Sequence, residues 1–96
     1  MTKAYLMGHI TVTNPEEYKK YSQAVPATIE KQGGKYLVRG GSSTQREGEA
    51  LRDRHVIVEF PSRQALDTWY DSPEYQAILH LRTDNSIGQI VLVDGL

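Results

Sequence analysis

Residues 10–17 have the sequence ITVTNPEE, and residues 56–62 have the sequence VIVEFPS. In both segments a strand-like run is followed by a proline, which suits the first turn of a helix. Each helical segment then ends near a glycine and leads into a second apolar run. These runs are GGKYLV at residues 33–38 and GQIVLV at residues 88–93. The chain therefore contains one strand–helix–strand unit twice.

Two such units in succession give the order β-α-β-β-α-β, the split arrangement of ferredoxin-like domains. We therefore expect an α+β sandwich with one antiparallel sheet of four strands in the order 4-1-3-2, and with both helical connections on one face. The expected strands are residues 4–13, 35–41, 53–60 and 86–94. A length of 96 residues predicts one domain, residues 1–96.

Helix boundaries are marked by capping residues. Asn14, before Pro15, predicts the start of the first helix, and Ser72, before Pro73, predicts a break and a fresh start in the second. Pro26 lies inside the first helix and removes a hydrogen bond to the carbonyl of residue 22, so we expect a kink or a restart there.

The composition excludes several classes of protein. The chain has 11 Lys and Arg against 12 Asp and Glu, a net charge of −1, which argues against nucleic-acid or anionic-membrane partners. It has no cysteine, so disulfide scaffolds and thiolate zinc sites are excluded. No run approaches 18 apolar residues, and Gly8 and His9 interrupt the N-terminal apolar run. We therefore expect a cytoplasmic protein without a membrane partner.

The last strand is apolar on both faces, because Val91 and Val93 point to one side and Ile90 and Leu92 to the other. Helices cover only one face of an open four-stranded sheet. The other face needs a partner, and a second copy of the same chain is the simplest one. The sequence therefore predicts a homodimer.

Three motifs together resemble a small bacterial family known only as a domain of unknown function, within the dimeric α/β-barrel superfamily. They are GGKYLVRGG at residues 33–41, VEFPS at 58–62 and WYDSPEYQ at 69–76, followed by Arg82. The resemblance implies a homodimeric α/β barrel, in which two sheets face each other and the helices lie outside. Cofactor-free monooxygenases of aromatic polyketides, small isomerases and haem proteins are relatives in that superfamily. Nothing in this sequence marks an axial haem histidine, and the family itself implies no particular reaction.

Four polar residues of the strands are candidate catalytic groups. His55 and Glu59 are expected on the sheet face away from the helices, and His9 and Arg39 could share it. Together they could perform acid–base chemistry, with Arg39 holding an enolate or a carboxylate. The alternative is a structural ion pair between Arg39 and Glu59, with the histidines at its edge.

The candidate substrate-binding residues are Tyr18, Tyr21, Trp69, Tyr75 and Arg82. The aromatic side chains could line a flat pocket between helices and sheet, although aromatics at helical spacing are more often core. Arg82 could bind a substrate anion. Alternatively, it could interact favourably with the helix dipole or pair with Glu74.

No two histidines have metal-ligand spacing, and the polar loop at residues 40–49 lacks the phosphate-loop pattern, so we expect neither a metal nor another cofactor. That loop is long for a hairpin and is expected to be an exposed tip. The functional hypothesis is a homodimer that binds or transforms a small organic molecule. The alternative is a non-catalytic dimeric sensor, carrier or interaction module.

Overall fold

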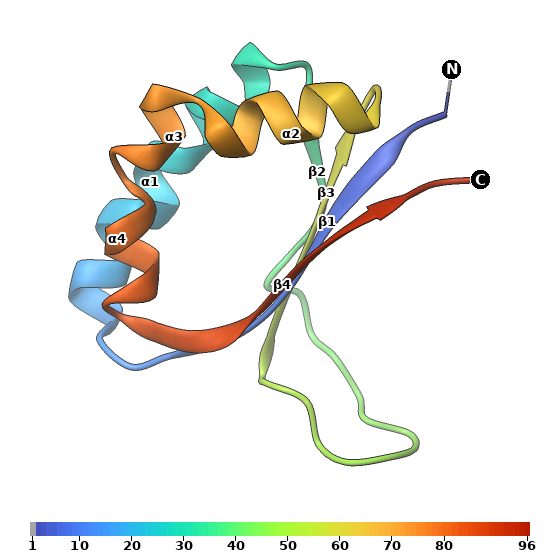
Figure 1. Cartoon of the computed structure of the whole chain (residues 1–96). Helices are drawn as coiled ribbons and strands as arrows, with labels where there is room; N and C mark the ends of the chain where they lie inside the picture. The colour runs from blue at the N-terminus through green and yellow to red at the C-terminus, as the bar shows by residue number, and fades with distance from the viewer. Residues whose placement is uncertain (1) are drawn as a thin grey trace.

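The computed structural model describes residues 2–96 and shows two strand–helix–strand units (Figure 1). The elements are β1 (Ala4–Val12), α1 (Pro15–Lys31), β2 (Lys35–Arg39), β3 (Arg54–Phe60), α2 (Arg63–Asp71), α3 (Pro73–Gln76), α4 (Leu79–Thr83) and β4 (Ser86–Asp94). The predicted order is confirmed, with the second helical connection divided into three short helices. No helix among residues 2–96 has the length and apolar character needed to cross a bilayer.

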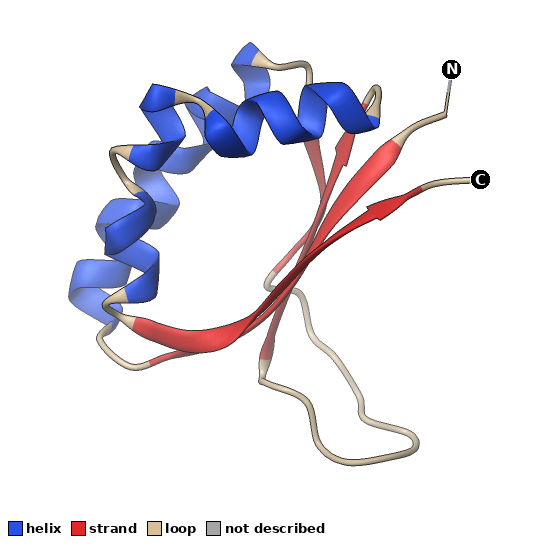
Figure 2. Cartoon of the chain, in the orientation of Figure 1, coloured by secondary structure: helices blue, strands red, loops and turns tan. Residues whose placement is uncertain are grey.

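The sheet has the order β2-β3-β1-β4, and every neighbouring pair is antiparallel. This is the predicted order 4-1-3-2 counted from the other edge. Figure 2 shows all the helices on one side of the sheet, so no helix among residues 2–96 covers the other face. The α+β ferredoxin-like fold is confirmed.

The core lies between the helices and the sheet face that they cover, which we call the inner face. Alternation along β1 directs Ala4, Leu6 and Ile10 to this face, and all three are buried. Val58 and Phe60 of β3 join them as cross-strand partners of Leu6 and Ala4. The opposite face, which we call the outer face, carries the alternate residues.

Both predicted helix starts are capped by the expected side chains. The Asn14 Oδ1 accepts the backbone N–H of Glu17 at 3.3 Å, and the Ser72 Oγ accepts that of Tyr75 at 3.2 Å. The chain breaks at Ser72, as predicted, and α3 begins at Pro73.

The helix α1 continues from Pro15 to Lys31 without interruption, so the restart considered at Pro26 does not occur. Proline leaves the Ser22 carbonyl without its helical donor. In this fold the Arg39 guanidinium, from the neighbouring strand β2, donates a hydrogen bond to that carbonyl. A tertiary contact thus satisfies the group that Pro26 leaves free.

Candidate functional site

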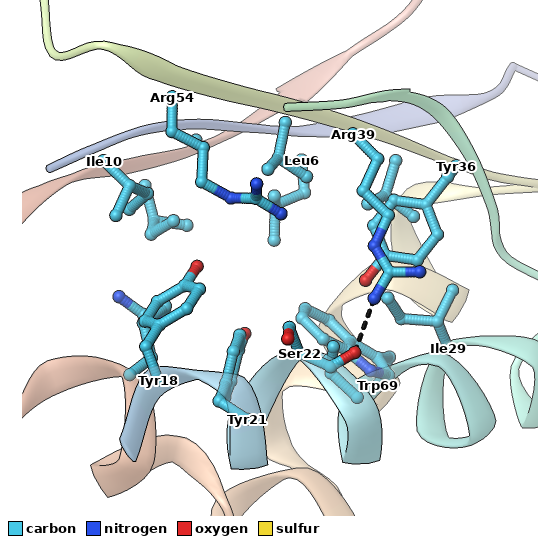
Figure 3. Close-up of a pocket in the computed structure, with 16 residues that line it drawn as sticks. Leu6, Ile10, Tyr18, Tyr21, Ser22, Ile29, Tyr36, Arg39, Arg54 and Trp69 are labelled. Atoms are coloured by element: carbon cyan, nitrogen blue, oxygen red, sulfur yellow. Dashed lines mark hydrogen bonds between the residues drawn. The ribbon is translucent and has the colours of Figure 1, made fainter. Parts of the chain in front are cut away.

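A cavity of about 40 Å³ lies between α1 and the inner face of the sheet. Apolar side chains of β1, β3 and α1 form most of its wall, including Leu6, Val25 and Val56. The polar and aromatic part of the lining consists of Tyr18, Tyr21, Ser22, Tyr36, Trp69, Arg39, Arg54 and Arg82. A volume of this size holds about three water molecules. Figure 3 shows Arg39 and Arg54 projecting from the sheet toward α1, and Tyr18 and Tyr21 projecting from α1 toward the sheet.

Two tyrosines of the cavity, Tyr21 and Tyr36, are neutral hydroxyl groups. The hydroxyls of Tyr21 and Tyr75 lie 2.9 Å apart and share a buried hydrogen bond. Burial raises the pKa of Tyr21 far above its usual range, and the neighbouring Tyr75 adds to this rise. Burial also raises the pKa of Tyr36. Near neutral pH these groups can donate or accept hydrogen bonds, but they are not bases.

Two arginines that line the cavity have buried hydrogen-bond donors. Arg82, from α4, is only 9% exposed, and its guanidinium carbon lies 5.9 Å from the centre of the Tyr21 ring. Arg54, from the start of β3, stands 5.9 Å from the centre of the Tyr18 ring. The Nε atoms of both arginines are buried and make no hydrogen bond with any residue of the described chain.

Arg39 lies on the inner face, which corrects the prediction that it shares a face with His9, His55 and Glu59. In the pairing of β2 with β3, Tyr36 faces Val58 but Val38 faces Ile57, so Leu37 is an extra, bulged residue. A bulge reverses the alternation beyond it. The Arg39 guanidinium therefore stands 4.6 Å from the centre of the Tyr36 ring and reaches α1.

The outer face does carry His9, His55 and Glu59, as predicted. His9 and His55 are cross-strand partners, and their Nδ1 atoms lie 3.0 Å apart. Glu59, however, forms ion pairs with Lys3 at 3.2 Å and Lys35 at 3.6 Å. The hydrogen bond from Lys3 is the main reason that the pKa of Glu59 is lowered. The proposed ion pair between Arg39 and Glu59 is therefore wrong, because the two side chains lie on opposite faces.

The aromatic candidates pack together, and only part of the group faces the cavity. The Trp69 Nε1 donates to the Thr28 Oγ1 at 3.0 Å, and the Trp69 ring centre lies 4.1 Å from that of Tyr75. Tyr18, Tyr21 and Trp69 line the cavity. Tyr75 is core and reaches the site through its hydroxyl bond to Tyr21.

The alternative pairing of Arg82 with Glu74 is wrong. The Glu74 carboxylate binds Lys31 at 2.6 Å, and this contact lowers the pKa of Glu74. Arg82 instead lies in the last turn of α4, where it meets the Tyr21 ring. Its position at a helix C-terminus also suits the helix dipole.

The sequence argument missed Arg54. Arg54 has the same parity along its strand as Val56, Val58 and Phe60, so strict alternation already places it on the inner face. The local backbone leaves room for this arginine: Gly40 has a φ of 69°, and a side chain on it would overlap the Arg54 guanidinium. Across residues 2–96, no group of three or more His, Cys, Asp or Glu is placed to hold a metal ion.

Comparisons with solved structures support the fold. The chain is similar to a protein of unknown function from Rhodopseudomonas palustris, with 18% identity and a TM-score of 0.79, covering 99% of this chain and 83% of that one. It is similar to SnoaB, a cofactor-independent oxygenase from Streptomyces nogalater, with 15% identity and a TM-score of 0.65, covering 96% and 91%. It is also similar to a dabb family protein with a ferredoxin-like fold from Mesorhizobium loti, with 16% identity and a TM-score of 0.55, covering 100% and 97%. At these identities the similarity shows the fold alone.

No curated protein matches the chain. A family model does match it, over residues 3–96, and its description is "Domain of unknown function (DUF1330)". The resemblance seen in the sequence motifs is thereby confirmed. The chain belongs to the DUF1330 family, a family of unknown function.

Proposed function

We propose that this protein binds a small organic molecule in the cavity between α1 and the sheet, without a metal or nucleotide cofactor. The observation that carries this proposal is an apolar chamber into which a few polar groups converge from separate elements. Small-molecule sites typically combine mostly apolar walls with a small number of placed polar groups. Arg54 and Arg82, with the Tyr21 hydroxyl, are those groups here.

The lining favours binding over proton abstraction by the protein. Among the described residues that line the cavity, none is Asp, Glu or His. The Tyr21 hydroxyl, with its raised pKa, does not act as a base near neutral pH. The lining therefore supports a role as a sensor or carrier.

Transformation of the bound molecule is the second candidate. It is favoured by the similarity of the fold to SnoaB, whose description is a cofactor-independent oxygenase. In this chain such chemistry would rely on the arginines to stabilise negative charge that develops on the substrate.

Closing the cavity tests the proposal. Ser22 is half-buried on α1 and lines the cavity, whereas its neighbour Gln23 is exposed. We expect Ser22→Phe to abolish ligand-induced thermal stabilisation across a library of small organic molecules. Gln23→Phe, on the same helix, should retain the wild-type response. Equal responses from both variants, or no response from the wild type, would contradict the proposal.

We also propose that the outer face is covered by a second copy of the chain. Ile87, Val91 and Val93 of β4 are 52%, 49% and 38% exposed, and Met7 and Ile57 extend this apolar strip onto β1 and β3. A credible interface buries at least about 1,000 Å² in total. Sedimentation at micromolar concentration should report twice the chain mass, and a stable monomer would refute the dimer.

A further inference from the structure

The cavity is strongly cationic in a chain that is slightly anionic overall. Arg39, Arg54 and Arg82 all line it, and no carboxylate does so among the described lining residues. The whole chain has a net charge of −1. A shallower groove adjoins the cavity, shares Tyr18, Ser22 and Arg54 with it, and adds Lys19. Positive charge is therefore concentrated along one path from the surface to the interior.

None of the three arginines has a counter-ion among residues 2–96. Arg39, however, already donates to the Ser22 carbonyl that Pro26 leaves free. Arg54 and Arg82 are thus the groups available to a ligand.

Burial makes an unpaired guanidinium costly. Arg82 is nine-tenths buried, and both Nε donors lack an acceptor. Burial alone would lower the pKa of Arg82, but the neighbouring Tyr75 and Tyr21 outweigh it and raise that pKa, so the group stays charged. A buried charge without a partner is destabilising, and a bound anion removes that penalty.

We propose, as an extension of the proposed function, that the ligand is an organic carboxylate whose head group sits between Arg54 and Arg82. A carboxylate has three heavy atoms, and the cavity volume of about 40 Å³ has room for about three water-sized groups. The planar guanidinium fork matches a planar carboxylate, with charge-assisted hydrogen bonds. The Tyr21 ring lies beside Arg82, and its hydroxyl can donate to the head group when Tyr75 is the donor in their shared hydrogen bond.

The remainder of the ligand extends toward the surface. The adjoining groove is lined by Val12 and Pro15 as well as by Tyr18 and Lys19. An apolar body therefore meets Val12, Pro15 and the Tyr18 ring, while its acid group lies deeper. The site thus selects an acid with a short apolar or aromatic body.

The test uses matched pairs of acids and neutral amides. Benzoate is compared with benzamide, and butyrate with butanamide, by isothermal titration calorimetry at pH 7 and low salt. We expect each acid to bind at least about tenfold more tightly than its amide. Inorganic phosphate, which carries charge without an apolar body, should bind more weakly than either acid.

Variants of Arg54 test whether the acid binds at the proposed position. Arg54→Met keeps most of the side-chain volume and removes the charge, and Arg54 is only half-buried, so the fold should survive. It should weaken benzoate binding at least about tenfold. Arg46→Met makes the same change of charge in the exposed loop and should leave binding within about twofold. Arg54→Lys should fall between Arg54→Met and the wild type, because it keeps the charge but not the fork.

The possible failures are distinct. If amides bind as tightly as acids, and Ser22→Phe removes both, the carboxylate inference is wrong while the cavity remains a binding site. If acids bind but Arg54→Met and Ser22→Phe leave that binding unchanged, the acids occupy another site and the inference is wrong. If phosphate binds more tightly than both acids, the assignment to carboxylates is wrong. If no compound binds at millimolar concentration, the proposed function fails with it.

Discussion

The two faces of the sheet differ in whether their charged side chains have partners. On the outer face the charged Glu59 has two lysine partners, and His9 and His55 contact each other. At the cavity beside the inner face, the half-buried Arg54 and the buried Arg82 form no ion pair with any of residues 2–96. Paired charges at a surface cost little free energy, whereas a buried charge without a partner is destabilising, so such a group beside a cavity is a candidate for a functional site. The contrast favours the two proposals, ligand binding at the inner face and assembly through the outer face.

The largest effect is expected from removing an inner-face aromatic. Phe60 is fully buried, and its ring centre lies 5.5 Å from that of Trp69. Phe60→Ala should destabilise the chain by about 3–5 kcal/mol, measured by urea unfolding. Val91→Ala on the outer face removes a smaller side chain that is 49% exposed in the single chain, and it should cost clearly less than Phe60→Ala even when a second copy covers it. Similar losses for both would refute the distinction between a core face and an assembly face.

The next effect tests the outer face as an interface. Ile57 faces outward as the partner of Met7, so Ile57→Glu would place a charge against the same face of a second copy. We expect the dimer to dissociate, with sedimentation reporting the mass of one chain, because a buried carboxylate without a partner is costly. Gln64→Glu, on the exposed surface of α2, makes the same change of charge and should leave the dimer intact. A dimeric Ile57→Glu variant would move the interface elsewhere.

A smaller effect is expected from the hydroxyl pair beneath the inner face. Tyr21→Phe removes one partner of the 2.9 Å bond to Tyr75 and leaves the other hydroxyl buried. The expected loss is about 1–3 kcal/mol of unfolding free energy. Adding Tyr75→Phe to that variant should cost little more, because the stranded hydroxyl is then also removed. Additive losses in urea unfolding of the two single variants and the double variant would show that the two hydroxyls do not act as a pair.

Most of the sheet could be predicted from the sequence, because alternation of side chains is a local property. The sequence correctly placed Val56, Val58 and Phe60 on one face and His55, Ile57 and Glu59 on the other. The caps at Asn14 and Ser72 were also visible, since each side chain acts within its own turn. These features need no knowledge of distant residues.

The site itself was harder to predict. The face of Arg39 and the restart at Pro26 were both predicted wrongly, because both depend on contacts between distant segments. The bulge at Leu37 moved Arg39 to the inner face, and no local signal marks that bulge in the run KYLVR. The Ser22 carbonyl then accepts from Arg39, which lies 17 residues away in sequence. Arg54, in contrast, had the right parity and could have been found by following the alternation one step further.

The smallest effect concerns the outer-face carboxylate and its pH dependence. Lys3 and then Lys35 hold the pKa of Glu59 below its usual value in the folded chain. A carboxylate whose pKa is lower in the folded state stabilises the fold above its unfolded pKa, and this contribution is lost as the pH falls through the folded pKa. Glu59→Gln should therefore lower the urea midpoint slightly at neutral pH. The difference in urea midpoint between Glu59→Gln and the wild type should shrink as the pH falls below the ordinary glutamate pKa of about 4.3.

The matched control for this variant is Glu30→Gln. Glu30 is exposed on α1 and forms no ion pair with any residue among 2–96. Its replacement should leave the urea midpoint close to the wild-type value at each pH. A gap for Glu59→Gln that stays constant from neutral to acid pH would mean that the lost contact is not ionic. The ion pairs of Glu59 with Lys3 and Lys35 would then add nothing measurable to the free energy of unfolding, as is common for ion pairs at a protein surface.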